Sequence, residues 1–329
     1  MKKYFLLLAA IVLVFSSCKT NTGSSLQGST GSTYELLVVA DNRVWNGEIG
    51  ETIKEFFHQP DTTMLMVEPL YSTPQITPDQ LTNNEMFKRF KSILIIEINP
   101  SKAAKVEMQD TVWAVPQRIF TIIAPDYEAF TSVFDEYKEY LLQKYAETER
   151  SKLNRYFETA LSRDVMKQVG EKFGYTFNIT TGFYVAKNLQ DFMWLRSETS
   201  KTSTNIMIYV EDYVSEDQLT APYITLKRNL ITQQHVPASL EGSYVKISDV
   251  FPLTTKNIFF KGNTYATEVR GAWDTHNDVM GGTFLSYTIV DNLNNKILTI
   301  DGFVYIPNKP KRTFMMQLEA MFWSLRQYP

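Results

Sequence analysis

The clearest fold signal in the first half of the chain is the stretch YELLVVADNRVWNGEIGETIKEFF, residues Tyr34–Phe57. Its apolar run Leu36–Ala40 has the length and continuity of a strand that is buried on both faces. A polar turn follows, and after it apolar side chains recur at helical spacing, at Ile49, Ile53, Phe56 and Phe57. A buried strand, a turn and an amphipathic helix in this order predict the first unit of an α/β layer.

The same alternation continues to about Arg150. Apolar runs predict further strands, and side chains repeating at helical spacing predict helices between them. Thr77 before Pro78 is a typical helix start, because threonine caps the first free amides and proline fits the first turn. We expect strands at Met64–Leu70, Ile93–Ile98 and Ile119–Ala124, and helices at Pro78–Phe90, at Ser101–Met108 and around the stripe Phe130–Leu141. Residues 34–150 are therefore predicted to form an α/β domain with a largely parallel sheet.

A charged stretch, Glu147–Lys152, separates the stripe that ends at Leu141 from a second apolar stripe between Leu153 and Val165. Such a stretch is compatible with a domain junction, and also with the solvated middle of one long helix. We favour the junction, which places a second domain at residues 151–329.

The second half of the chain is richer in strand-like runs. Three runs precede a helical segment twice: first Phe177–Ala186, Phe192–Arg196 and Asn205–Val210 before Gln218–Gln233, then Tyr265–Trp273, Thr283–Val290 and Lys296–Ile306 before Lys311–Gln327. This order predicts an α+β domain, and it leaves open that a strand–strand–strand–helix unit is duplicated.

Residues 1–17 have the layout of a secretory signal peptide. Lys2 and Lys3 precede the apolar stretch Tyr4–Phe15, and two serines stand before Cys18. The apolar stretch is shorter than the ~20 residues that a membrane-spanning helix needs. The segment resembles a bacterial lipoprotein signal, in which acyl chains such as palmitate become attached to the cysteine. An ordinary signal with an incidental cysteine is less favoured, because Cys18 is the only cysteine of the chain.

The expected anchor sets the expected location. Residues 18–33 carry serine, threonine, glycine and asparagine with almost no apolar side chains, which predicts a flexible tether. Lys19 follows the cysteine, where the familiar sorting scheme would place an aspartate for inner-membrane retention, and no acidic run follows. We therefore expect an outer-membrane lipoprotein that faces the periplasm, with the membrane as one partner through its lipid.

Charge and composition narrow the other partners. The chain has a formal net charge of −3, and removing the signal takes two lysines, so that −3 − 2 gives −5 for the mature chain. A mildly acidic protein without basic blocks is a poor nucleic-acid binder, so we expect no nucleic acid but an envelope protein or glycan as a further partner. The balance of 44% hydrophobic and 21% charged residues is that of a globular protein.

The sequence carries none of the common catalytic signatures. Absent are the G-x-S-x-G serine elbow, the H-E-x-x-H zinc motif, the G-x-G-x-x-G dinucleotide loop and the Walker lysine loop. A cysteine nucleophile is excluded if Cys18 is acylated. We therefore expect no cofactor and commit to neither a metal site nor a catalytic residue.

The densest polar stretch is EVRGAWDTHNDVMGG, residues 268–282. In a strand, Glu268 and Arg270 point to the same face, where they could pair or bind a ligand. Asp274, His276 and Asp278 alternate after them and could hold a cation or act as an acid–base group. A loop whose aspartates bond the local backbone is the favoured alternative for these three residues.

Two further places could bind a ligand. Asp41, Arg43 and Trp45 follow the first strand, and ligands of open α/β sheets bind beyond the carboxyl ends of the strands. A helix entry whose tryptophan covers the core edge is the favoured alternative there. The aromatic cluster of Phe183, Tyr184, Phe192 and Trp194 suggests a stacking platform, although alternating aromatic residues in strands more often lie in a core.

With its Ser-Ser-Cys-Lys start, the turn DNRVWNGEIG at residues 41–50 and the long stretch from Glu268 to Pro307, the chain resembles a family of Bacteroidetes-type lipoproteins. That family is catalogued only as a domain of unknown function, so the resemblance implies an envelope lipoprotein and transfers no activity. The leading hypothesis is a non-enzymatic binding or assembly module of the cell envelope. The alternative is a hydrolase of an envelope polymer or lipid that uses Asp274, His276 and Asp278.

Overall fold

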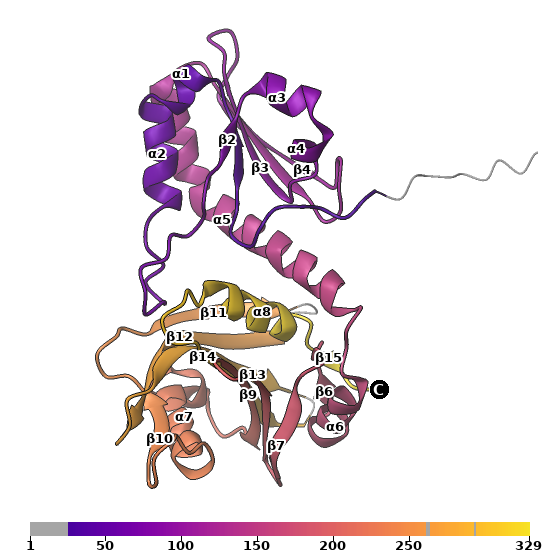
Figure 1. Cartoon of the computed structure of the whole chain (residues 1–329), viewed down its shortest axis with the longest axis vertical. Coiled ribbons are helices and arrows are strands. Elements are labelled where there is room, and N and C mark those ends of the chain that lie inside the picture. Colours follow the sequence, from indigo (N-terminus) through magenta and orange to yellow (C-terminus); the bar gives the residue numbers. More distant parts are fainter. Residues whose placement is uncertain (1–25, 261–263, 293) are drawn as a thin grey trace, which may run out of the picture.

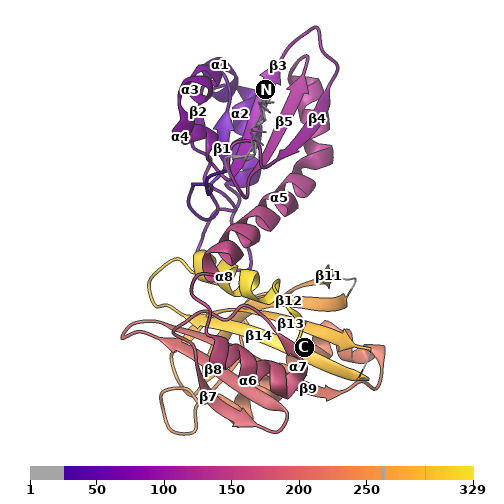
Figure 2. The ribbon, with the colours of Figure 1, turned by 90° about the vertical axis from the view of Figure 1, so that its right-hand side faces the viewer.

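The structure, a computed structural model, describes residues 26–260, 264–292 and 294–329. Two parts lie one above the other, each with its own sheet, and the long helix α5 (Tyr127–Phe157) runs from the upper part down to the lower one (Figures 1 and 2). Cys18 and the expected signal peptide lie outside the described residues.

The N-terminal part is built on a five-stranded sheet in the order β2-β1-β3-β5-β4. Neighbours among the first four strands are parallel, and β4 pairs with β5 in the antiparallel direction. Its strands are β1 (Leu37–Val39), β2 (Gln75–Ile76), β3 (Ser92–Ile98), β4 (Lys105–Asp110) and β5 (Arg118–Ala124). The expected α/β class with a largely parallel sheet is confirmed.

Helices cover both faces of this sheet, which explains the continuous apolar runs of its central strands. On one face Val38, Leu94 and Phe120 pack with residues of α2 (Glu48–Phe57) and α5. On the other face Leu37 and Ile93 pack with Leu81 and Phe87, from the short helices α3 (Pro78–Asn83) and α4 (Glu85–Lys88). The loop after β1 forms one helical turn, α1 (Asn42–Trp45). Thr77 caps α3 as expected, in a capping box with Gln80.

Two predictions about this half are wrong. Ser101–Met108 was expected to be helical, but residues 105–110 form β4, an exposed edge strand with charged side chains. Met64–Leu70 was expected to be a strand and is an irregular loop. The loop makes its contacts with the C-terminal part instead of the sheet. Met64 packs in the C-terminal core, and Glu68 accepts hydrogen bonds from the backbone amides of Lys311 (2.8 Å) and Arg312 (3.2 Å).

The stretch Glu147–Lys152, where we favoured a junction, lies inside α5, which runs unbroken for 31 residues. Only part of its charge is exposed to solvent. Glu149 is paired with Lys91 at 3.1 Å, with both side chains almost completely buried, and it accepts a hydrogen bond from the Tyr34 amide (3.1 Å). The structure therefore contains one long helix here, as in the alternative, but Glu149 in its middle is buried and paired instead of solvated.

The C-terminal part is built on an eight-stranded antiparallel sheet in the order β10-β12-β13-β14-β9-β8-β7, with β11 also paired to β12. Its strands are β7 (Tyr184–Leu189), β8 (Phe192–Glu198), β9 (Ser203–Asp212), β10 (Tyr244–Ile247), β11 (Thr254–Phe260), β12 (Thr264–His276), β13 (Gly281–Asp291) and β14 (Lys296–Tyr305). Its other elements are α6 (Arg163–Phe173), the 3-10 turn η1 (Glu216–Leu219), α7 (Ala221–His235), α8 (Arg312–Phe322) and the short pair β6 (Tyr175–Thr176) and β15 (Arg326–Gln327).

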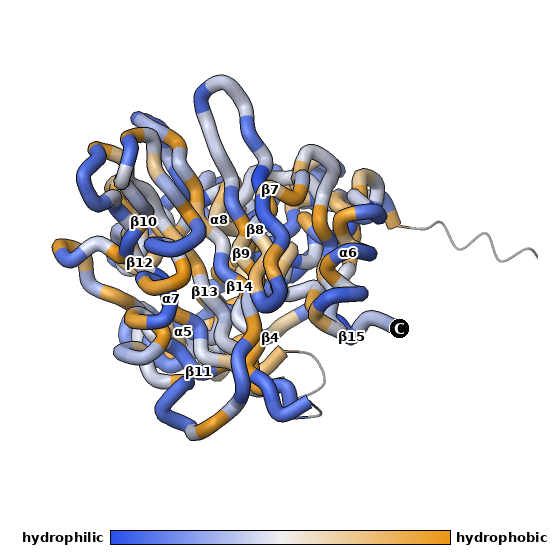
Figure 3. The backbone as a smooth tube through the Cα atoms, turned by 90° about the horizontal axis from the view of Figure 1, so that it is seen from below, coloured by the Kyte–Doolittle hydropathy of each residue, from blue (hydrophilic) through white to orange (hydrophobic). Residues whose placement is uncertain are grey.

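Alternate residues of the long strands serve two separate cores. Met193 and Ile206 face α6 and α8, whereas Trp194 and Met207 face α7. Seen from below, the hydrophobic segments lie mainly in the inner strands, and many of the outer loops are hydrophilic (Figure 3). The order of three strands and a helix does occur twice, in β7–β9 with α7 and in β12–β14 with α8. The two helices nevertheless cover opposite faces of the sheet (Figure 1).

Part of the expected tether is attached to the N-terminal part. Gly28 bridges to Val115 and Thr30 bridges to Phe90. The carbonyl of Gly31 accepts a hydrogen bond from the Lys152 side chain (2.7 Å). The backbone of this segment finds partners although its side chains are small and polar, so composition alone misplaced the end of the tether.

The buried pair of Lys91 and Glu149 yields a test of this packing. Glu149→Ala leaves the Lys91 ammonium buried without its carboxylate, so the free energy of unfolding should fall by about 3–5 kcal/mol in urea denaturation. Glu147→Ala, two residues earlier, removes a more exposed ion pair with Lys144 and should cost less than about 1 kcal/mol. Equal losses for the two variants would contradict the packing described here.

Candidate ligand-binding site

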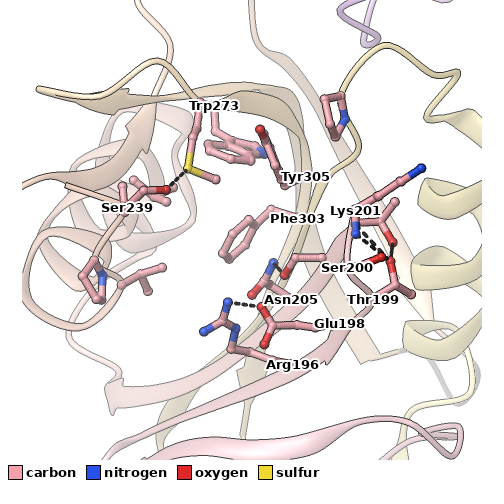
Figure 4. A pocket seen from close by; sticks show the side chains of 18 of the residues that line it. Arg196, Glu198, Thr199, Ser200, Lys201, Asn205, Ser239, Trp273, Phe303 and Tyr305 are labelled. Atoms are coloured by element: carbon pink, nitrogen blue, oxygen red, sulfur yellow. Dashed lines mark hydrogen bonds and ion pairs between the residues drawn. The ribbon is translucent and has the colours of Figure 1, made fainter.

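A cavity of about 650 Å³ opens on the α7 face of the C-terminal sheet (Figure 4). Strands β8, β9, β12 and β14 form its base. Three loops, at residues 199–202, 236–239 and 307–309, form its rim. Cavities of this size typically hold small organic ligands.

Aromatic side chains line the base of the cavity. Trp273 lies edge-on against Phe303, with ring centroids 5.5 Å apart, and beside Tyr305 at 6.4 Å. The indole of Trp273 donates a hydrogen bond to the carbonyl of Val304 (3.2 Å), so the ring is fixed. Gly282 makes room for it, because a Cβ there would lie 2.6 Å from the indole nitrogen.

One wall of the cavity is polar. The Arg196 guanidinium lies over the Trp194 ring, 4.7 Å from its centroid, and is paired with Glu198. Glu198 also accepts a hydrogen bond from the Tyr184 hydroxyl (2.6 Å), and this bond raises the pKa of Tyr184. Asn205 accepts from the Trp194 indole (3.1 Å), which ties the polar wall to the aromatic base.

The expected aromatic platform is divided by the fold. Trp194 lines the cavity, and Phe192 lies in the same core, against the ring of His235 at 4.7 Å. Phe183 belongs to the core on the opposite face, and Tyr184 is half exposed on the edge strand β7. The sequence did not reveal Trp273, Phe303 and Tyr305 as lining residues. Alternation places Phe303 and Tyr305 on one face of their strand, but it does not show which strand brings Trp273 beside them.

Asp274, His276 and Asp278 do not form one cluster. Asp274 is paired with Lys246 at 3.1 Å, and His276 stacks on Tyr244 with ring centroids 4.9 Å apart. Asp278 accepts hydrogen bonds from the amides of Val279 (2.7 Å) and Ser239, and these bonds lower its pKa. Within the described ranges no group of three or more histidine, cysteine, aspartate or glutamate side chains could hold a metal ion. Each residue has a local partner, as in the favoured structural alternative.

Asp41, Arg43 and Trp45 lie beyond the carboxyl end of β1, as expected. Trp45 is covered by the Lys54 ammonium, 4.4 Å from the ring, and packs against the core of the N-terminal part. Asp41 precedes α1 but makes no capping hydrogen bond, and Arg43 is exposed. None of the three lines the α7-face cavity, so the loop has the features of the helix entry that was the alternative.

Glu268 and Arg270 do pair, with Arg270 donating to Glu268 at 2.7 and 2.9 Å. They lie beside a second cavity of about 720 Å³, located between the two parts and bordered by α5, α8 and β11. Arg270 also donates to Glu319 (2.7 Å), which accepts from Arg150 of α5 as well (2.6 Å). We call these four residues the seam network.

The charges of the seam network neutralise one another. Burial alone would raise the pKa of Glu319, but the charges of Arg270 and Arg150 and their hydrogen bonds lower it to about 2. Burial alone would lower the pKa of Arg270. The charges of Glu268 and Glu319 outweigh burial, so the pKa of Arg270 is raised. The network is therefore a structural joint, in which each ionised group has its partner.

The seam network predicts an acid dependence of stability. The pKa of Glu319 lies below its ordinary value of 4.5, so the ionised form favours the folded state. This contribution is complete above pH 4.5 and is lost as the pH falls toward 2, by about 1–3 kcal/mol. Glu319→Gln should flatten the pH dependence of the free energy of unfolding in this range. Glu136→Gln, an exposed change on α5, should leave the pH dependence intact; a loss in both variants, or in neither, would refute the assignment.

Two family models match the chain. Residues 29–158 match DUF8532 and residues 162–324 match DUF4837, and each is described only as a domain of unknown function. The boundary between the two matches falls just after α5. No curated protein matches the chain.

Among solved structures, the Ran-binding protein Mog1p of Saccharomyces cerevisiae is similar at 9% identity. The match covers 47% of this chain and 90% of Mog1p, with a TM-score of 0.32. A mutant of the protein Mog1 gives 8% identity, 47% and 91% coverage and a TM-score of 0.31. Likenesses this weak carry no argument about function.

Proposed function

We propose that the protein is anchored by lipid in the cell envelope and binds a small ligand in the cavity on the α7 face. Each of its two parts matches a domain of unknown function. The cavity carries this proposal. A fixed aromatic base and a polar wall meet in one concave space, which is the usual build of a small-molecule site.

The lining of the cavity favours binding over chemistry. Among the described lining residues, Glu198 is the one with a carboxylate. It forms an ion pair with Arg196 and accepts a hydrogen bond from the Tyr184 hydroxyl. The hydrolase alternative would need Asp274, His276 and Asp278 to converge, and each of them is turned to a different local partner.

The anchor part of the proposal is supported by the sequence around Cys18. Acylation at this cysteine would hold the protein in the outer membrane, facing the periplasm. Gly28 stands ten positions after Cys18 and bridges to Val115 of the N-terminal part, so this point of the N-terminal part lies within ~35 Å of the proposed anchor. No helix in the described part of the chain is long and apolar enough to cross a bilayer.

Blocking the cavity tests the binding proposal. Ala238 lies on the rim, and Ala238→Trp would place an indole in the space that the ligand needs. The protein without its signal is incubated with small molecules extracted from cell envelopes, and the bound compounds are released and identified by mass spectrometry. We expect the wild type to retain a compound that Ala238→Trp loses.

The matched control is Ala104→Trp, at an exposed position of the N-terminal part. It should retain the compound, and both variants should unfold within ~0.5 kcal/mol of the wild type, as surface changes do. Retention of the same compounds by Ala238→Trp, or no retained compound in any variant, would contradict the proposal.

The anchor is tested by Cys18→Ser. Two or more acyl chains give stable membrane attachment, because each buried methylene contributes ~0.8 kcal/mol. We expect the wild type in the membrane fraction with a lipid-bearing first residue by mass spectrometry, and the variant in the soluble fraction. An unmodified Cys18 thiol in purified wild type would refute the anchor and leave the cavity proposal standing.

A further inference from the structure

The charges around the α7-face cavity differ from those of the chain as a whole. The chain is acidic, with a net charge of −3. The cavity is lined by three cations, Arg196, Lys201 and Lys309, against the single carboxylate of Glu198 among its described lining residues. A concave site with an excess of one charge attracts ligands of the opposite sign.

Arg196 is the cation best placed to meet a ligand. Its guanidinium reaches from β8 toward the open space in front of Phe303 (Figure 4). Trp194 supports the guanidinium plane, and Glu198 pairs with only one end of it. The Nε atom is buried, so the guanidinium offers a ligand its Nη atoms, of which Nη2 already donates to Glu198. A guanidinium held in this way keeps charged N–H donors that a carboxylate or phosphate accepts.

Lys201 and Lys309 stand on two different rim loops and are exposed. Neither ammonium forms an ion pair or a hydrogen bond among the described residues. The first loop is held by a hydrogen bond between the hydroxyls of Thr199 and Thr202 (2.8 Å). The carbonyl of Lys309 accepts from the Lys311 side chain (3.1 Å), which attaches the second loop to the start of α8. The loops thus place two unneutralised charges at the mouth of the cavity.

The rest of the cavity suits an apolar body. Trp273, Phe303 and Tyr305 line the base, and Val245 and Met280 extend the apolar lining on the side of β10 and the β12–β13 turn. Burial of flat or apolar surface on such a base supplies binding free energy without fixing one chemical identity.

We infer that the cavity takes an organic anion, a molecule with an apolar or flat body and a carboxylate, phosphate or sulfonate group, with the anionic group at Arg196 and between the two lysines. This inference rests on the proposed binding function and specifies its ligand class. The seam cavity does not share the property, because Arg150 and Arg270 there are neutralised by Glu268 and Glu319.

The test uses two probes of the same body and different charge. 8-Anilinonaphthalene-1-sulfonate carries a sulfonate, and N-phenyl-1-naphthylamine is its neutral counterpart; both fluoresce more strongly in apolar surroundings. Fluorescence titration of the protein without its signal should give at least tenfold tighter binding of the anionic probe, about 1.4 kcal/mol. Added salt should weaken binding of the anionic probe and leave that of the neutral one unchanged.

Two variants separate charge from cavity. The double variant Lys201→Gln with Lys309→Gln should lower the affinity for the anionic probe about tenfold, and so should Arg196→Gln. In both variants the affinity for the neutral probe should stay unchanged. Lys102→Gln with Lys105→Gln removes two exposed charges from the N-terminal part and should alter neither affinity. Ala238→Trp should abolish binding of both probes.

The outcomes distinguish the two proposals. If both probes bind equally well, and Ala238→Trp abolishes both, the cavity binds ligands but the anion class is wrong. If Ala238→Trp leaves the anionic probe bound, the probe binds elsewhere, and this inference fails together with the cavity as its site. A tenfold loss in the N-terminal lysine variant would likewise overturn it, because total charge would then explain the preference.

Discussion

The carboxylate of Glu319 lies between the guanidinium groups of Arg150 and Arg270, and the arrangement of the two parts depends on this contact. Arg150 belongs to α5 of the N-terminal part, whereas Arg270 and Glu319 belong to the C-terminal part. A buried carboxylate is costly unless cations and hydrogen bonds accompany it. Arg270 and Glu319 pair within the C-terminal part, but the second guanidinium at Glu319 comes from Arg150, so the network is complete only when both parts are in place, which couples α5 to α8 and β12.

This constraint also bears on where a ligand could bind. At the seam the ionised groups use one another as partners, so a charged group of a ligand there would have to compete with contacts that hold the parts together. On the α7 face Glu198 pairs with one end of the Arg196 guanidinium, and the ammonium groups of Lys201 and Lys309 form no ion pair among the described residues. The two cavities are similar in size, and the one on the α7 face differs in carrying lysine charges without a partner among the described residues.

Local patterns predicted much of the fold, and contacts distant in sequence explain what they missed. The strand around Leu36–Ala40 and the cap at Thr77 follow from neighbouring residues. The strand prediction for Met64–Leu70 was wrong because the Met64 side chain packs in the core of the C-terminal part. The pair of Glu268 and Arg270 was predictable, since residues two apart in a strand share a face. Periodicity does not encode which strands and helices become neighbours. It therefore could not predict the partners of this pair on α5 and α8, or the contact of Trp273 with Phe303 and Tyr305.

A crystal structure of the protein with 8-anilinonaphthalene-1-sulfonate bound tests the location of the ligand site most directly. The structure described here predicts density for the probe in the α7-face cavity, with its rings against Phe303 and its sulfonate within ~3.2 Å of the Arg196 guanidinium. Density for the probe at the seam between α5 and β11, with the α7-face cavity empty, would contradict this assignment.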